Sequence, residues 1–376
     1  MRELGESELE WAAEGAAVLG TGGGGNTYLA RLDVRRLVRA GARVRVATVD
    51  DMPDDAFGPV VGGMGAPTVG IERLPIAGRF GELVEAAGRA LGRRPSFVAI
   101  GEIGGANAIR PLSAAAETDL PVLDADPMGR AFPELQMSTY MIGGLAPQPM
   151  ILNDGKGVLA VLENVPDPPT AERYGRALTW AMGGSTGLSL SVVTTAQVRT
   201  HGIPGTLDLA LRIGEAMARA RTRKRSTVDA IGDVVPGMRR LFEGKIVDLS
   251  RRTTAGFARG RVTIDGLGAH RGERLLIDFQ NEYLIARPAD DGAEPLLTVP
   301  DLLVLIEAES GRALGSEMVR YGLRLEVLGM PAPRELRTAA ALRTVGPAAF
   351  GYADAYRPLA GDLLDRPGPP AGRAAS

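Results

Sequence analysis

The chain has 376 residues, a formal net charge of −2 at pH 7 and no cysteine. The balanced charge argues against bulk nucleic-acid binding, and the lack of cysteine excludes disulfides, thiolate catalysis and cysteine–zinc sites. The N-terminal segment lacks the basic-then-apolar order of a signal peptide, and no apolar run is long enough to span a bilayer. We therefore expect a cytoplasmic protein that binds a small molecule, and neither nucleic acid nor a membrane.

The first part of the chain alternates between apolar segments of helix type and of strand type. Helices are expected over residues 6–18 and from near Thr27, and strands within 42–51, 95–100 and 121–123. Strands that alternate with helices in this way are the signature of an α/β domain. We therefore predict an α/β fold for this part of the chain.

A proline-rich segment at 165–174 predicts a hinge and a domain boundary. Beyond it, helices are expected over 170–184 and 206–224, and a strand over 188–200. Short alternating runs between about 236 and 330 predict a β-rich part. The expected organisation is an N-terminal α/β domain over 1–165, an α+β C-terminal domain over 166–365 and a disordered tail over 366–376.

The densest group of polar residues lies in PVLDADPMGRAFPELQM at 121–137. An apolar pair leads directly into two aspartates, and the carboxyl end of a strand is where open α/β sheets bind ligands. The alternative is a loop held together by its own Asp–Arg pairing. We predict catalytic roles for Asp124, Asp126, Arg130 and Glu134, and a substrate-binding role for Gln136.

A glycine loop follows the first predicted helix. It lacks the lysine of a P-loop and does not follow a strand, so it fits neither common phosphate-binding fingerprint. Its backbone N–H groups are free to turn toward an anion or a developing oxyanion. The alternative is a flexible turn between two helices. The predicted substrate-binding residues of this loop are Gly22, Gly23, Gly24, Gly25 and Asn26.

Two further polar groups follow predicted strands. Glu102 and Asn107 come after the strand at 95–100, and the sheet-edge argument places them in the same cleft as substrate-binding residues. The alternative is a solvated glutamate at the start of a helix. Residues 278–282, with two acids and two amides, follow a C-terminal strand, and there a surface hairpin is the leading interpretation.

A divalent metal ion is compatible with the acidic loop. Carboxylates and imidazole suit Zn²⁺, Mn²⁺ or Mg²⁺, and the proposed ligands are Asp124, Asp126 and His201, although no spacing is diagnostic of one metal. His201 is favoured over the other histidine, His270, because His270 lies at a predicted hairpin tip. A lone histidine is, however, more often structural than catalytic.

Several motifs occur together and in order: GTGGGGNTYLAR, GEIGGANAI, DADPMGRAFPELQM, LFEGKIVDLSRRTTAGFARG and IDFQNEYLIA. Over residues 6–358 they resemble the S-methyl thiohydantoin desulfurase family, also called DUF917. The resemblance implies an N-terminal α/β domain, a second C-terminal domain, and links to hydantoinase and oxoprolinase-type proteins. The family name implies hydrolysis at the amidine-like carbon of an S-methylated thiohydantoin, which releases methanethiol and leaves a hydantoin.

We therefore predict a hydrolase that acts on a small cyclic amide or amidine-like substrate, of the S-methyl thiohydantoin, hydantoin or lactam type. Asp126 or Asp124 is the expected general base, Arg130 and the glycine-loop amides stabilise negative charge, and a metal would activate the water. One alternative is a non-catalytic subunit or partner of a hydantoinase or oxoprolinase-type enzyme. Another is an ATP-dependent enzyme that uses the glycine loop. The apolar C-terminal strands lead us to expect a homo-oligomer.

Overall fold

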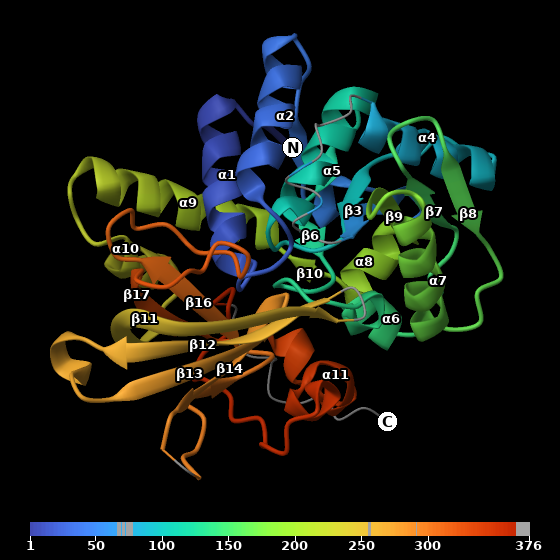
Figure 1. The fold of residues 1–376 in the computed structure, drawn as a ribbon. Coiled ribbons are helices and arrows are strands. Elements are labelled where there is room, and N and C mark those ends of the chain that lie inside the picture. Colours follow the sequence, from blue (N-terminus) through green and yellow to red (C-terminus); the bar gives the residue numbers. More distant parts are fainter. Residues whose placement is uncertain (66–68, 70–71, 73–77, 255–256, 291, 366–376) are drawn as a thin grey trace, which may run out of the picture.

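The computed structural model describes residues 1–65, 69, 72, 78–254, 257–290 and 292–365. It contains an α/β part, built on a sheet flanked by helices, and an antiparallel β part that lies below it in the view of Figure 1. The predicted fold class is confirmed. None of the described helices is long and apolar enough to cross a membrane.

An eight-stranded sheet forms the centre of the α/β part, with the strand order β1-β2-β5-β4-β3-β9-β7-β8. The four strands from β2 to β3 run parallel, and the remaining pairs are antiparallel. The carboxyl ends of the parallel strands therefore meet at one edge. The strands are β1 (Arg2–Glu3), β2 (Arg45–Ala47), β3 (Phe57–Gly65), β4 (Val98–Ile100), β5 (Val122–Leu123), β7 (Met150–Asn153), β8 (Leu159–Leu162) and β9 (Ser185–Thr194).

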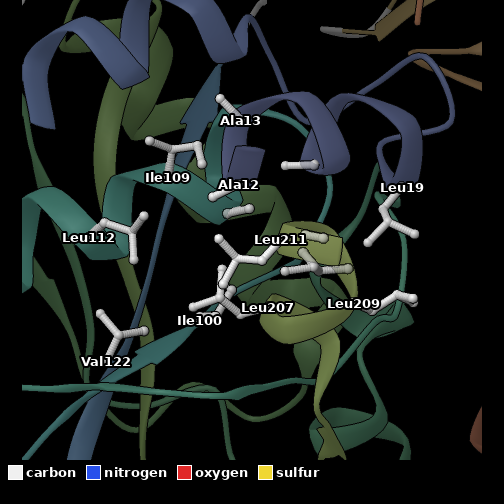
Figure 2. Packing of buried hydrophobic residues seen from close by; sticks show 14 of the residues in the cluster. Ala12, Ala13, Leu19, Ile100, Ile109, Leu112, Val122, Leu207, Leu209 and Leu211 are labelled. Atoms are coloured by element: carbon white, nitrogen blue, oxygen red, sulfur yellow. The ribbon is translucent and has the colours of Figure 1, made fainter. Parts of the chain in front are cut away.

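Helices cover both faces of this sheet. The first face carries α1 (Glu6–Leu19), α2 (Thr27–Arg39), α4 (Arg79–Leu91), α5 (Ala106–Thr118) and α9 (Thr206–Thr222), and α10 (Thr227–Val234) packs on α9. The second carries α6 (Thr139–Ile142), α7 (Pro168–Ala181) and α8 (Thr195–His201). Side chains of β4 alternate between the two cores: Val98 and Ile100 face the first, and Ala99 faces the second. Figure 2 shows Ile100 and Val122 beneath apolar side chains of α1, α5 and α9.

Helix α9 comes from the second half of the sequence but packs on α1 in the first core. The two helices approach closely at Gly15 and Gly214. A Cβ atom at either glycine would overlap backbone atoms of the opposite helix, at Ala210 and Trp11 respectively. Strand β9 likewise joins the sheet of the first half, where it pairs with β3. Residues 185–222 therefore contribute to the packing of the α/β part.

One predicted element differs from the structure. The expected strand over 188–200 ends at Thr194, and Thr195–His201 is helix α8. The cause is a capping box, in which the Gln197 backbone N–H donates to Thr194 Oγ1 at 3.2 Å and the Thr194 N–H donates to Gln197 Oε1 at 2.8 Å.

The β part is a seven-stranded antiparallel sheet with the order β15-β14-β13-β12-β11-β17-β16. Its inward side chains form a separate apolar core that includes Phe242, Ile277 and Tyr283. A short pair, β6 (Ala125–Asp126) with β10 (Ile203–Pro204), lies outside the large sheets. The other elements are β11 (Arg239–Thr254), β12 (Phe257–Gly266), β13 (Arg274–Gln280), β14 (Glu282–Pro288), β15 (Leu297–Thr298), β16 (Leu302–Glu307), β17 (Arg324–Met330) and α11 (Ala339–Val345).

Candidate active site

A cavity of about 200 Å³ lies at the carboxyl ends of β3 and β4. Its walls come from the glycine loop after α1, the start of α5, the loop after β6, and the β13–β14 turn. Both halves of the sequence therefore contribute to one site. The charged side chains in its lining include Arg79, Glu102, Arg110, Glu134, Glu172, Arg176 and Glu282.

Glu102 is a buried carboxylate in the wall of the cavity, with 6% of its surface exposed. One carboxylate oxygen accepts a hydrogen bond from the Asn107 side chain, and the other accepts the Phe132 backbone N–H at 3.2 Å. Burial raises the pKa of Glu102 to about 7, against the lowering effect of these two hydrogen bonds. A glutamate with a pKa near 7 is suited to accept a proton at neutral pH.

Glu282, at the start of β14, is a second buried carboxylate in the same wall, with 3% exposed. Its Oε2 atom is buried and has no hydrogen-bond partner among the described residues. Burial raises the pKa of Glu282 well above its ordinary value, and the nearby Glu102 carboxylate raises it further, while Arg130 lowers it. Two neighbouring carboxyl groups of this kind favour a state in which one is protonated and the other is ionised.

Asn107 connects Glu102 to a cation. Its side-chain N–H₂ donates to Glu102, and its Oδ1 accepts from the Arg110 guanidinium. All three residues line the cavity. Burial lowers the pKa of Arg110 to about 10, so the guanidinium is still charged at neutral pH. The start of α5 thus presents a carboxylate, an amide and a cation to one cavity.

The glycine loop shapes the cavity and joins the two halves. Gly24 and Gly25 line the cavity, whereas Gly22 and Gly23 do not. The carbonyls of Gly24 and Gly25 accept the backbone N–H groups of Asn107 and Ala106 at the start of α5, at 3.2 and 3.1 Å. The Gly22 carbonyl accepts an N–H from the loop that follows β16.

Asn26 also lines the cavity, but its side chain caps α2. Its Oδ1 accepts the backbone N–H groups of Tyr28 and Leu29 at 3.0 and 3.3 Å. A phosphate bound at this helix start would need these same N–H groups, which already donate to Asn26. The geometry therefore gives the ATP-dependent alternative no support.

Asp124 and Asp126 do not line the cavity. Asp124 accepts the N–H groups of Leu207 and Asp208 at the start of α9, at 2.8 and 3.3 Å. Asp126 accepts the N–H groups of Ile103, Met128 and Gly129 at 2.9 to 3.0 Å. Burial raises the pKa of each carboxyl to about 6. Neither residue is in the cavity wall, and their hydrogen bonds indicate that they fix loops and helix starts.

Arg130 lies between the two halves of the molecule and is fully buried. Its guanidinium donates to Thr21 Oγ1 at 2.8 Å and to the carbonyls of Tyr283 and Asp301 at 3.1 and 2.8 Å. It is also outside the cavity wall, but its charge acts on Glu282 and Glu102. Arg130 can therefore stabilise the ionised form of these carboxylates electrostatically, although it does not line the cavity.

The later part of the acidic loop forms another stretch of wall. Glu134 lines the cavity and accepts a hydrogen bond from Gln136, which lies outside it. Glu172 and Arg176 of α7 form an ion pair beside it, and the Glu172 carboxylate also accepts the Leu135 N–H at 3.2 Å.

The structure does not assemble the expected metal ligands. Within the described residues, no three His, Cys, Asp or Glu side chains form a group that could hold a metal ion. His201 lies at the end of α8, and its ring packs against Gly143, where a Cβ atom would overlap it. Asp124, Asp126 and His201 therefore do not converge, because both carboxylates are held by backbone N–H groups.

Of the residues predicted from the sequence, Glu102, Asn107, Glu134, Gly24, Gly25 and Asn26 line this cavity, and their catalytic and binding roles stay predictions. Sequence reasoning missed Arg110 and the pairing of Glu102 with Glu282. A signal for Arg110 was present, since it is a single charge in the otherwise small and apolar run ANAIRPLSAAA. Glu282 carried a weaker signal, as an acid directly before the buried run YLIA.

The two buried carboxyl groups thus line a cavity at the ends of parallel strands, which is where open α/β sheets commonly bind ligands. The chain belongs to the S-Me-THD-like family: the model of the N-terminal domain matches residues 7–164 and that of the C-terminal domain matches residues 166–359. This confirms the predicted resemblance.

Among solved structures, a structural genomics target from Chromobacterium violaceum is similar. The two chains share 26% sequence identity with a TM-score of 0.79, over 95% of this chain and 100% of the other. No curated protein matches the chain. This likeness supports the fold.

Proposed function

We propose that the protein is a hydrolase that removes methanethiol from an S-methylated thiohydantoin ring. The observation that carries this proposal is the pair of buried carboxyl groups, Glu102 and Glu282, in one small cavity. Glu102, whose pKa is raised by burial to about 7, is the base, and Glu282, whose pKa burial raises well above its ordinary value, is the acid. The family match supports the choice of substrate class.

The chemistry requires one base and one acid. In the first step the water oxygen bonds to the ring carbon between the two nitrogens, its proton passes to Glu102, and Glu282 protonates the ring nitrogen of the C=N bond. In the second step the C–S bond breaks, the thiolate takes the proton from Glu102, and the new hydroxyl gives its proton to Glu282. The carbonyl of a hydantoin forms, methanethiol leaves, and both carboxyl groups return to their starting states.

The size of the cavity supports a small substrate. Its volume of about 200 Å³ is below the roughly 300–1,000 Å³ of typical pockets for drug-sized ligands. A five-membered ring with short substituents is a ligand of this size class. The proposal involves Asp124 and Asp126 only through the loops and the helix start that they hold.

The direct test is incubation of the purified protein with an S-methyl thiohydantoin in ¹⁸O-labelled water. The account predicts release of a free thiol and one ¹⁸O atom in the hydantoin carbonyl, with both signals reduced at least about 100-fold in Glu102→Gln. Absence of both products with the wild-type protein would overturn the proposal and favour the non-catalytic subunit. Metal analysis of the active sample tests the predicted metal independently.

A further inference from the structure

Arg110 is a cation in the cavity wall that makes no direct ion pair within the described residues; the nearby charge that acts on it is Glu102, which is held by the same Asn107 amide. Its side chain is half-buried on α5, and its one hydrogen bond goes to the neutral Oδ1 of Asn107. No carboxylate oxygen of the described residues lies within 4.0 Å of its guanidinium. The two other arginines of the wall are engaged: Arg176 pairs with Glu172, and Arg79 donates to the carbonyls of Asn153 and Ser185.

The guanidinium of Arg110 occupies space that two glycines leave open. A Cβ atom at Gly63 of β3 would overlap its Nη1 atom, and a Cβ atom at Gly25 would lie 3.8 Å from its Nη2 atom. In the part of the chain that the structure describes, Nε and Nη2 make no hydrogen bond. A fixed planar group with unused donors therefore borders the cavity.

A partly buried cation without a directly bonded carboxylate is stabilised when a ligand brings a negative charge to its free donors. Guanidinium binds carboxylates through parallel N–H donors, which makes arginine the preferred side chain for this task. We propose that Arg110 binds a carboxylate substituent of the substrate, so that the natural substrate is a ring bearing an acidic side chain. This inference rests on the proposed function and names the substrate class of the same site.

The charges of the cavity then orient the ring. Glu102 and Glu282 disfavour an anion on their side, whereas Arg110 attracts it. The substrate carboxylate therefore points to Arg110, and the reacting carbon faces the carboxyl pair. Asn107 lies between the carboxylate and the cation, because it holds Glu102 through its N–H₂ group and Arg110 through its Oδ1. Arg110 is in this account a specificity-determining residue.

The test uses two product-like ligands that differ by one charge, hydantoin-5-acetate and hydantoin-5-acetamide, in titration calorimetry with the full chain. For the wild type, the acetate is expected to bind roughly 10- to 100-fold more tightly, as for hydrogen bonds to a charged group. Arg110→Gln is expected to remove this preference, and Arg110→Lys to keep part of it. The control is the double variant Glu172→Gln/Arg176→Gln, which removes an existing ion pair from the same wall without a change in net charge and should retain the preference.

The wild-type comparison alone can overturn the inference, so it does not depend on the folding of a variant. Equal affinity for acetate and acetamide would refute it, as would a preference that persists in a folded Arg110→Gln protein. If Arg110 acted only by positioning Asn107, its replacement would lower the turnover of charged and neutral rings alike and would leave their relative affinities unchanged. If the acetate binds more tightly but no S-methyl thiohydantoin is hydrolysed, the proposed function is wrong and the anion site at Arg110 is supported. If neither ligand binds, both the proposed function and the anion site are wrong.

Discussion

At the scale of single residues, the site separates two kinds of buried carboxylate. Asp126 receives three backbone N–H groups, whereas Glu102 receives one backbone N–H and one side-chain amide and borders a cavity. Hydrogen bonds to the charged form stabilise it, so a carboxylate with many donors is a weak base. Glu102 combines fewer donors with access to a ligand, and this combination suits it for proton transfer.

The pH dependence of turnover belongs to this scale. Glu102 must be ionised to accept a proton, and burial raises its pKa to about 7. We expect kcat/KM of the wild type to fall about tenfold per pH unit below this value, and to level off above it until another group titrates. A steady-state profile between pH 5 and 9 measures this, and an acid limb centred near pH 4.5 would contradict the assignment.

The same raised pKa predicts a change in stability with pH. Below about pH 4.5 Glu102 is protonated in both the folded and the unfolded protein. Between about pH 4.5 and 7 only the folded protein keeps this proton, because its Glu102 has the higher pKa. The wild type therefore loses stability over this window as the pH rises, by up to about 3 kcal/mol, whereas Glu102→Gln does not. Urea unfolding of both proteins at pH 4.5, 6 and 8 should show that the free energy of unfolding of Glu102→Gln, relative to that of the wild type, increases with pH. A constant difference would refute the shifted pKa.

At the scale of elements, the glycine loop sets the position of Glu282. Gly23 has no left-handed backbone, but a Cβ atom there would overlap Glu282 Oε1. We expect Gly23→Ala to fold, to displace the Glu282 carboxyl and to lower kcat about 100-fold. Gly62→Ala is the matched control, since its Cβ would meet no atom nearer than 3.8 Å and most of the activity should remain. Equal activities of the two variants would contradict this role of the loop.

Asp124 illustrates an element held by a side chain from another part of the chain. Its carboxylate accepts the first N–H groups of α9, a helix that begins more than 80 residues later. We expect Asp124→Ala to destabilise the protein by about 1–2 kcal/mol, because these N–H groups lose their partner and the helix start loses a negative charge. Thermal unfolding measures the loss. A stable Asp124→Ala protein that has lost turnover would instead support the catalytic role predicted from sequence.

At the scale of the whole molecule, Arg130 links the α/β part to the β part. Its donors reach Thr21 on one side and the carbonyls of Tyr283 and Asp301 on the other. Arg130→Met should lower the free energy of unfolding by at least about 3 kcal/mol, because several buried acceptors lose their donor. Urea unfolding tests this, and the free energy of unfolding of Arg130→Lys is expected to lie between those of the wild type and Arg130→Met. An Arg130→Met protein as stable as the wild type would remove the claim that Arg130 joins the halves.

Local patterns predicted most of the elements and a few of the residues that line the cavity. The rule that ligands bind at the carboxyl ends of parallel strands led to Glu102 and Asn107, and it also led to Asp124 and Asp126. That rule locates a loop but not the direction of its side chains, which here depends on N–H groups from α9 and from Ile103. The partner of Glu102 lies 180 positions later, in Glu282, and no local spacing encodes that contact.

The central claim is that Glu102, and not Asp126, is the base. Its most direct test is the rate of thiol release by Glu102→Gln and Asp126→Asn, measured beside the wild type at pH 8 on proteins shown to be folded. The account predicts a loss of at least about 100-fold for Glu102→Gln, and for Asp126→Asn a lower melting temperature with turnover within about tenfold of the wild type. Full turnover by Glu102→Gln, together with a folded but inactive Asp126→Asn, would contradict it.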